Sequence, residues 1–380
     1  MHKPDYSTLR QDSKFSWSVS SSYLALLEIT GINIKEMFLN PSAGIELYRK
    51  GRPLLQERYG PDVGLPSPIS PPISYGHINT LGVELLFPEG GEVNHGTLCA
   101  TLQEGIEILR RPVDFANAGM TPFFLEYWRK MKEAFPGENV GFAFKGEGPL
   151  TTAYTLRRDE FFYDPYDKPE LTKEFLRLVT DSIIQFNRFL RNKIHGVPGE
   201  IDPDGTGLAD DVASMLGPDL WPEFVMPYLE QYFRGLTTGK RSAHIEDLRP
   251  EQLRFLEQLQ LTRYDPSVSP KLNPKIIRDK TRVPFLWRLC NFHYPSLTAQ
   301  ETADFVFQAT ADGASGVFTS VCHGMCDEAT AKKVHSFIAA CKTVDKMLNK
   351  EGASREDIRE LVSTAGRKKF WDNWPTKTVH

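Results

Sequence analysis

Residues 298–344 read TAQETADFVFQATADGASGVFTSVCHGMCDEATAKKVHSFIAACKTV, and this stretch predicts a helix, a strand and a second helix in turn. Thr298 with Glu301 three residues later is a capping box, which marks the start of the first helix. Gly316–Val321 is a short β-rich run, and Asp327 can cap the helix that follows it. This order of elements is typical of α/β proteins with parallel strands.

The alternation of strands and helices extends along most of the chain. Pro122, after the candidate N-cap Thr121, and Pro169 each open a helix whose apolar residues recur at helical spacing. Seven β-rich runs predict strands: Asp62–Ile69, Asn139–Phe144, Gly199–Asp202, Arg241–Ile245, Leu261–Tyr264, Val283–Cys290 and Gly316–Val321. An eight-stranded barrel needs one more strand, which we expect within the first sixty residues.

The predicted fold is a single-domain (β/α)8 TIM barrel of the α/β class. We expect the barrel over residues 46–350, a helical N-terminal extension over residues 1–45, and a C-terminal helix and tail over residues 351–380. The segment Pro66–Pro72 is expected to be an extended loop. Trp371 and Trp374 in the tail are expected to dock on the body of the protein or on a neighbouring subunit, with disorder as the alternative.

The composition indicates a globular protein in a reducing compartment. Of the 380 residues, 40% are hydrophobic and 25% are charged, enough to bury a large core. The net charge of -4 leaves no basic surplus for phosphates, which argues against a nucleic-acid partner.

The first thirty residues lack the apolar region of a signal peptide, and no apolar run is long enough to span a bilayer. Five cysteines form a sparse, odd-numbered set, unlike a disulfide framework. Of these, Cys341 lies among apolar residues at helical spacing and is expected in the core. We therefore expect a cytoplasmic protein without membrane contact.

The segment Ser242–Asp247 offers two metal ligands at a predicted strand end. Side chains alternate along a strand, so His244 and Glu246 should point the same way while Ile245 points to the opposite side. In a barrel, the carboxyl ends of the strands face the active site. The alternative is that the two side chains only hydrogen-bond each other or their neighbours.

Cys322 follows the last predicted strand. A thiolate, an imidazole and a carboxylate are ligand types that zinc takes, and a catalytic zinc keeps one of its four positions open. The sequence therefore predicts a zinc site of three ligands, His244, Glu246 and Cys322. His323 and Cys326, in the same loop, are weaker candidates, because a Cys-x-x-x-Cys spacing before a helix is not specific.

Other polar residues cluster at the predicted strand ends and would line one cavity. Among them we expect substrate binding or proton transfer from Glu147, Asp211, Tyr264 and His293. The remaining members of this set are Lys145, Asp202, Asp204, Asp210, Asp265, Arg288 and Asn291. Each residue alone is more often a structural hydrogen-bond partner than a catalyst. The run KGEGP at 145–149 lacks the ending of a phosphate-binding loop.

Several stretches resemble the uroporphyrinogen decarboxylase superfamily over about residues 45–345. They are RYGPD at 58–62, LGVELLF at 81–87, GPL at 148–150 and, most specifically, ADDVASMLGPDLWPEFVMPYL at 209–229. The last stretch matches the family's strand-end aspartate, its turn ending in proline and its Phe-Val-x-Pro-Tyr helix. The superfamily contains cofactor-free porphyrinogen decarboxylases and zinc-dependent methyltransferases that work with corrinoid proteins.

Within the superfamily, the resemblance favours the methyltransferases. The decarboxylases grip porphyrinogen carboxylates with an arginine-rich N-terminal segment, whereas only Arg10 precedes residue 49 here. The methyltransferases hold zinc with a His-x-Cys at one strand end and a cysteine at a later strand end. His244 and Cys322 match the first and last of these ligands, and Glu246 stands in place of the middle cysteine.

A carboxylate in place of a thiolate makes zinc a harder Lewis acid, which suits an oxygen-bound substrate. The resemblance thus implies a zinc-dependent methyltransferase that moves a methyl group between a small substrate and cobalamin carried by a separate corrinoid protein. The candidate substrates are a methyl ether, as in O-demethylation, and a thiol whose sulfur the zinc binds as thiolate. A metal-free uroporphyrinogen-type decarboxylase and a non-enzymatic subunit of a methyltransferase complex are the alternatives. The methyl donor, the methyl acceptor, the direction of transfer and a homodimer stay open.

Overall fold

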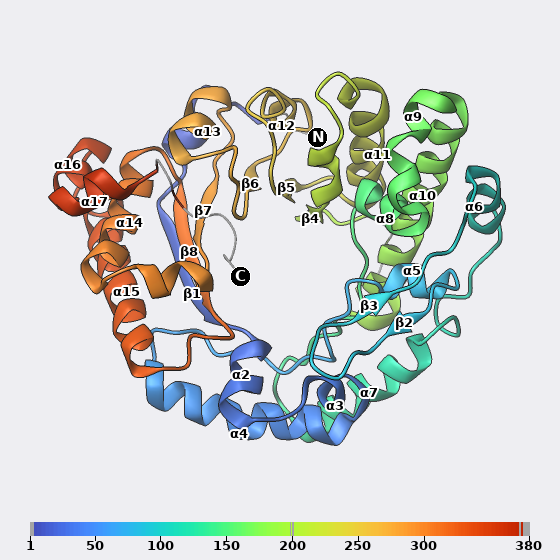
Figure 1. Cartoon of the computed structure of the whole chain (residues 1–380), viewed down its shortest axis with the longest axis horizontal. Helices are drawn as coiled ribbons and strands as arrows, with labels where there is room; N and C mark the ends of the chain where they lie inside the picture. Colours follow the sequence, from blue (N-terminus) through green and yellow to red (C-terminus); the bar gives the residue numbers. More distant parts are fainter. Residues whose placement is uncertain (1–3, 198, 200, 372–373, 375–380) are drawn as a thin grey trace. The chain divides into compact units, whose positions relative to one another are not determined.

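The computed structural model describes residues 4–197, 199, 201–371 and 374, and it shows helices that alternate with parallel strands (Figure 1). Contacts within the chain divide it into two compact units. The first unit comprises Asn33–Ile45 and Ser67–Ile245. The second comprises the residues up to Ile32, Glu46–Pro66 and the chain from Glu246 onward. Each unit is described by itself.

The second unit is built on a parallel sheet of three strands in the order β1-β8-β7 (Figure 1). These strands are β1 (Ser16–Ser21), β7 (Leu286–Leu289) and β8 (Gly316–Val321). Residue Gly316 of β8 pairs with Ser16 on one side and Leu286 on the other. Single parallel bridges extend the sheet from Ser20 to Gly64 and from Phe285 to Tyr264 of the short strand β6 (Arg263–Asp265).

The first unit contains a parallel pair of strands, β4 (Gly205–Ala209) and β5 (Lys240–His244), whose last residues are paired with each other. Single parallel bridges also join Ile69 to Gly141 and Ile73 to Phe144. A small antiparallel pair, β2 (Leu85–Leu86) and β3 (Asn94–His95), completes the described strands of this unit.

Helices surround the strands of each unit. In the first unit they are α3 (Ile34–Leu39), α5 (Gly76–Thr80), α6 (Leu102–Leu109), α7 (Thr121–Ala134), α8 (Pro149–Arg157), α9 (Asp164–Asp167), α10 (Pro169–Phe189) and α11 (Met226–Leu236), with the short turns η1 (Arg158–Phe162), η2 (Leu190–Ile194), η3 (Asp211–Met215) and η4 (Trp221–Val225). In the second they are α1 (Leu9–Asp12), α2 (Tyr23–Thr30), α12 (Arg254–Gln258), α13 (Pro274–Lys280), η5 (Asn291–Ser296), α14 (Ala299–Ala311), α15 (Glu328–Asn349), α16 (Arg355–Glu360) and α17 (Thr364–Lys369). The helix α4 (Pro41–Tyr59) contributes residues to both units.

Local capping signals gave the most accurate helix predictions. The capping box of Thr298 and Glu301 is formed at α14, and Asp327 caps α15 by accepting a hydrogen bond from the backbone N–H of Thr330. The helix predicted from Pro169 begins at that residue, whereas Thr121 is the first residue of α7 and not its N-cap. Cys341 is fully buried, as expected of a core residue.

Strand predictions were less accurate elsewhere. The runs predicted as strands at Asp62–Ile69 and Asn139–Phe144 contain only single bridged residues, which are Gly64 and Ile69 in the first run and Gly141 and Phe144 in the second. The strand expected at Gly199–Asp202 lies instead at β4, because the Asp202 carboxylate accepts hydrogen bonds from the backbone N–H groups of Asp204 and Gly205 and so forms a turn. The segment Pro66–Pro72, expected to be a loop, includes a bridged residue, Ile69.

The eighth strand expected within the first sixty residues is β1. The N-terminal segment therefore carries a strand of the second unit's sheet in addition to the helices expected there. Together these findings establish a mixed α/β fold with parallel strands, and closure into an eight-stranded barrel stays a prediction. No helix within the described residues is long and apolar enough to cross a membrane.

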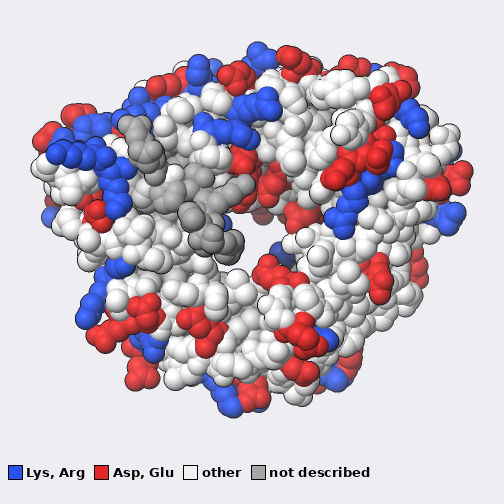
Figure 2. Space-filling model, in the orientation of Figure 1, with Lys and Arg blue, Asp and Glu red and all other residues white. Residues whose placement is uncertain are grey.

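The C-terminal aromatic residues dock on the second unit. The indole N–H of Trp371 donates to the buried carboxylate of Asp312 at 2.9 Å, and the rings of Trp371 and Trp374 both contact Phe305. Docking on the body of the protein is thus confirmed for these two residues, and the tail after residue 374 lies outside the described residues. Lys and Arg side chains gather on the surface over α16 and α17 (Figure 2).

Gly316→Ala should destabilise the protein, because a Cβ at residue 316 would lie 2.3 Å from the backbone oxygen of Ser16 in the neighbouring strand. Overpacking of this kind costs about 1–3 kcal/mol. Gly217→Ala is the matched control, since a Cβ there meets no atom within 4 Å, and it should change stability by less than about 0.5 kcal/mol. Urea denaturation measures both variants, and equal stabilities would contradict the close pairing of β1 with β8.

Candidate metal centre

Three potential metal ligands meet near the carboxyl ends of β4 and β5. His244 is the last residue of β5, and Asp211 opens the turn that follows β4. Because the two strands are parallel and their last residues are paired, both side chains leave the sheet at the same edge. The distance from His244 Nε2 to Asp211 Oδ1 is 3.8 Å.

Glu246 completes the group. It follows His244 by two residues, so the chain itself keeps the two side chains close. One ligand atom from each of Asp211, His244 and Glu246 lies within 4.8 Å of the others, and all three side chains are half-buried. Two ligands bound to one tetrahedral zinc at about 2.1 Å are themselves about 3.4 Å apart, so small side-chain movements would bring this group to coordination distance.

Glu147 lies close to this group on the loop that precedes α8. Burial raises the pKa of its carboxyl, the charge of Asp211 raises it further, and a hydrogen bond with Ser74 and the charge of His244 lower it. Because Asp211 and His244 both act on this carboxyl, Glu147 faces the same polar region. A carboxyl with a raised pKa holds its proton at a higher pH and can serve as a proton donor.

Two further residues of this region were not expected from the sequence. Ser74 and Tyr75 follow the bridged residue Ile73, and burial raises the pKa of Tyr75, with Glu147 as the next cause. The ring of Tyr75 packs on His95 with centroids 4.3 Å apart. The neighbouring prolines suggested a loop here, which concealed the strand end that would have pointed to these side chains.

Asp210, beside Asp211, has a structural role. Its carboxyl is fully buried and accepts hydrogen bonds from the backbone N–H groups of Leu150 and Thr151, at 3.0 and 2.7 Å, and from the Thr151 hydroxyl. Burial raises the pKa of Asp210 to about 7 despite these hydrogen bonds. A Cβ on Gly148 would lie 2.6 Å from this carboxyl, so the contact requires glycine there.

Cys322, the third predicted zinc ligand, follows β8 in the second unit and is half-buried. Burial raises the pKa of its thiol, while Arg288 lowers it and Glu28 raises it. Burial also raises the pKa of Cys290 to about 11, and Cys322 and Glu246 both contribute to that increase. Cys322 is not a member of the group formed by Asp211, His244 and Glu246, and its role as a ligand stays a prediction.

The two weaker ligand candidates, His323 and Cys326, lie in a loop shaped by Glu28. The carboxylate of Glu28 accepts hydrogen bonds from the backbone N–H groups of Gly324 and Cys326, and it lies 3.3 Å from His323 Nδ1. The Cys326 thiol is buried and donates to the backbone oxygen of Ala25. These contacts account for both residues as parts of the loop.

Tyr264 and His293 are both fully buried. Tyr264 belongs to β6, and His293 Nδ1 accepts a hydrogen bond from the backbone N–H of Cys290 at 3.0 Å. Several other predicted polar residues also have local partners. Asp202 pairs with Arg191, Asp265 accepts from the backbone N–H of Ser267, and Asn291 donates to the backbone oxygen of His323.

Asp210→Ala should lower the free energy of unfolding by about 1–3 kcal/mol, because the first turn of α8 would lose a buried acceptor. Asp211→Ala makes the same change one position on, at a side chain that is 48% exposed, and should alter stability by less than about 0.5 kcal/mol. Chemical denaturation of the two variants in the presence of EDTA, which removes any metal bound at Asp211, measures the contrast. A larger loss for Asp211→Ala would show that the roles of the two aspartates are reversed.

Comparison with known proteins identifies the family. The family model described as uroporphyrinogen decarboxylase (URO-D) matches residues 75–344, more than half of the chain. No curated protein matches the sequence.

Among solved structures, the fold is similar to that of a methyltransferase from Methanosarcina mazei, with a TM-score of 0.61 and 19% identity over 89% of this chain and 97% of that chain. The carboxyl transferase domain of Rhizobium etli pyruvate carboxylase matches at a TM-score of only 0.33, with 10% identity over 89% of this chain and 48% of that chain. The family resemblance read from the sequence is confirmed: the chain belongs to the uroporphyrinogen decarboxylase family.

Proposed function

We propose that this protein is a zinc-dependent methyltransferase that moves a methyl group from a small oxygen-linked substrate to cobalamin carried by a separate corrinoid protein. The observation that supports it most directly is the approach of Asp211, His244 and Glu246 to within 4.8 Å of one another. The similarity in fold to a methyltransferase from Methanosarcina mazei is consistent with this class of reaction.

The chemistry of the ligand atoms fits zinc. An imidazole and carboxylates are established zinc ligands, and three protein ligands leave the fourth position for substrate or water. In the proposal, His244 and Glu246 hold the metal, and Asp211 or Cys322 completes the set. When bound, zinc would act as a Lewis acid toward an ether oxygen, and a set rich in carboxylates would favour oxygen over sulfur.

Glu147 is the proposed proton donor. When a methyl group leaves an ether as a cation equivalent, the remaining oxygen gains an electron pair and needs a proton. The raised pKa of Glu147 keeps that proton available, and the charges of Asp211 and His244 act on the same carboxyl. A positioned acid of this kind contributes about 10²–10⁴-fold to a rate.

In the proposal, Tyr264 and His293 have a structural role and no catalytic one. Both are fully buried, so we assign them to the packing of strand β6 and of the loop after β7. Asp211 moves from the proton-transfer group predicted from sequence to the ligand group, on account of its 3.8 Å approach to His244.

Elemental analysis of the purified protein should find one equivalent of zinc per chain. His244→Ala and Glu246→Gln should remove most of it, because the first removes a ligand atom and the second replaces a charged carboxylate by a neutral, weaker amide ligand. The exposed control Glu251→Gln should retain the zinc. Asp211→Asn and Cys322→Ser then identify the remaining ligand as the residue whose loss lowers the zinc content. Full zinc content in His244→Ala would reject the centre.

Methyl transfer can be measured with reduced cobalamin, zinc-loaded protein and methoxylated aromatic compounds. The absorbance of methylcobalamin should rise as the ether is demethylated. Glu147→Gln should lower kcat by about 10²–10⁴-fold without loss of zinc, and the exposed control Glu138→Gln should leave kcat unchanged. Methylation of a thiol without reaction of any ether would overturn the choice of substrate. Decarboxylation of a porphyrinogen without zinc would overturn the whole proposal.

A further inference from the structure

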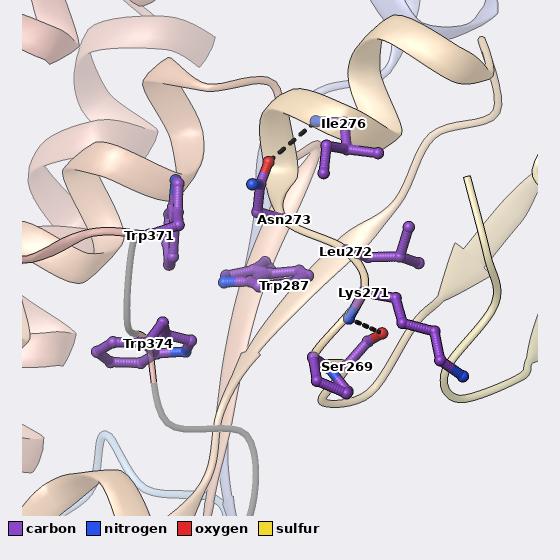
Figure 3. Close-up of a pocket in the computed structure, with 9 residues that line it drawn as sticks. Ser269, Lys271, Leu272, Asn273, Ile276, Trp287, Trp371 and Trp374 are labelled. Carbon is purple, nitrogen blue, oxygen red and sulfur yellow. Dashed lines mark hydrogen bonds between the residues drawn. The ribbon is translucent and has the colours of Figure 1, made fainter.

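Side-chain donors without a partner mark places where a ligand can bind. The buried indole N–H of Trp287 is such a donor, and Trp287 lines a cavity together with Trp371 and Trp374 (Figure 3). The volume of this cavity is about 100 Å³, which is less than the roughly 150 Å³ that holds one benzene molecule. Another group of donors lies in the first unit, near the proposed proton donor Glu147, and its members are only half-buried.

This group consists of Tyr75 and Arg158, which are both anchored on His95. Tyr75 precedes α5, His95 ends β3 and Arg158 follows α8, so three segments of the first unit meet here (Figure 1). The ring of Tyr75 packs on the imidazole of His95 with centroids 4.3 Å apart, and Nη2 of Arg158 donates to the backbone oxygen of His95 at 2.9 Å. His95 is therefore the common support of both side chains.

Each of the two side chains keeps a donor free. All hydrogen bonds of the Arg158 guanidinium run from Nη2 to His95 and Gly96, so Nε and Nη1 have no partner among the described residues. Arg158 also forms no ion pair with a carboxylate in the described part of the chain. The Tyr75 hydroxyl likewise has no hydrogen-bond partner within the described ranges. A guanidinium and a phenol that can both donate form a site for an anion.

The two donors lie close to each other and to Glu147. Burial raises the pKa of Tyr75, the charges of Glu147 and Glu92 raise it further, and the charge of Arg158 lowers it. The phenol therefore keeps its proton near pH 7 and lies within the electric field of the guanidinium. Burial lowers the pKa of His95, so its imidazole is neutral near pH 7 and Arg158 supplies the positive charge.

The backbone of Arg158 has a conformation that favours glycine. Its φ is 59° and its ψ is -149°, a region in which a side chain is strained. The chain before it is fixed by Arg157, whose guanidinium forms two hydrogen bonds with the buried carboxylate of Asp164, at 2.9 and 3.0 Å. Residues held in strained conformations cluster at binding and active sites. An arginine at a position that glycine would occupy more easily thus supports a functional role for its guanidinium.

The charges around Tyr75 favour a ligand with a single negative charge. The side chain of Glu92 is exposed and acts on the phenol from nearby. A phosphate dianion would bring a second negative charge next to this carboxylate, whereas a carboxylate ligand carries one charge for the one guanidinium of Arg158.

We propose that Arg158 and Tyr75 bind a carboxylate group of the substrate, so that the substrate is a methyl ether that also carries a carboxylate. Nε or Nη1 of Arg158 and the hydroxyl of Tyr75 would donate to the carboxylate oxygens, and the ether oxygen would face Glu147. The inference rests on the proposed function for the reacting end of the substrate. The binding of the carboxylate requires neither zinc nor methyl transfer.

Isothermal titration tests the carboxylate site directly. Each isomer of methoxybenzoate is compared with the same isomer of methoxybenzamide, which has the ring and the ether but no charge. The full-length protein is first freed of metal with EDTA and dialysed, so that no bound metal attracts the carboxylate. At least one methoxybenzoate should bind the wild type at least tenfold more tightly than its amide. Arg158→Gln should abolish this preference, and Tyr75→Phe should reduce it severalfold.

Two further variants control for effects on folding. Arg129→Gln is the matched control and should keep the preference, because the guanidinium of Arg129 donates to Glu126 on the surface of α7. Arg158→Gly should lose the preference and be at least as stable in urea as Arg158→Gln, because glycine adopts a φ of 59° without strain. The proposal fails if no methoxybenzoate binds more tightly than its amide, or if Arg158→Gly keeps the tenfold preference.

Methyl transfer from the same compounds to reduced cobalamin, with zinc-loaded protein, separates this inference from the proposed function. Arg158→Gln should raise KM for the methoxybenzoate at least tenfold and leave kcat nearly unchanged, as expected of a residue that only binds the substrate. Preferential binding of the carboxylate without any methyl transfer would reject the proposed function and uphold the carboxylate site. Equal kcat/KM for methoxybenzamide and methoxybenzoate would uphold the proposed function and overturn the site.

Discussion

The buried carboxyl group of Asp210 is the contact on which the candidate metal centre depends. It accepts hydrogen bonds from the backbone N–H groups of Leu150 and Thr151, while the backbone N–H of Asp210 donates a hydrogen bond to the carbonyl oxygen of His244. The backbone N–H of Gly148 donates in turn to the oxygen of Ala209. These bonds join the end of β4, the end of β5 and the first turn of α8. These hydrogen bonds hold the candidate site in position. His244 is bonded through its own backbone oxygen, Glu147 precedes Gly148, and Asp211 follows Asp210.

The second unit has a comparable junction around β1. The side chain of Asn349, at the end of α15, accepts from the backbone N–H of Phe15 and donates to its carbonyl oxygen. The residue after Phe15 begins the strand that pairs with β8, and Gly316 allows that close approach. The end of the longest helix of this unit is thus fastened to the start of its sheet, while Cys322 follows the other end of β8.

The sequence predicted helices and strands accurately where capping residues or β-forming residues mark them locally. It was less accurate where the burial of a side chain determines its role. Thr298, Asp327 and the run Gly316–Val321 carry their own capping and β-forming signals, and each was located correctly. The strand β1 was expected only somewhere in the first sixty residues, because its serines obscure the apolar pattern of a strand. The carboxylates Asp210 and Asp211 are indistinguishable by residue type. Their roles are separated only by the correct bounds of β4, because the alternation of buried Leu208 and exposed Ala209 at its end continues to Asp210, which is buried.

The serine-rich composition of β1 has a consequence for synthesis on the ribosome. Ser20 and Ser320 face each other across the sheet but are separated by 300 residues along the chain, so β1 emerges long before β8 can pair with it. An unpaired apolar strand would be prone to aggregate during that interval. In β1 the serines at positions 16 and 20 are exposed and Val19 is buried. A strand with few apolar groups can remain in water until its partner has been made.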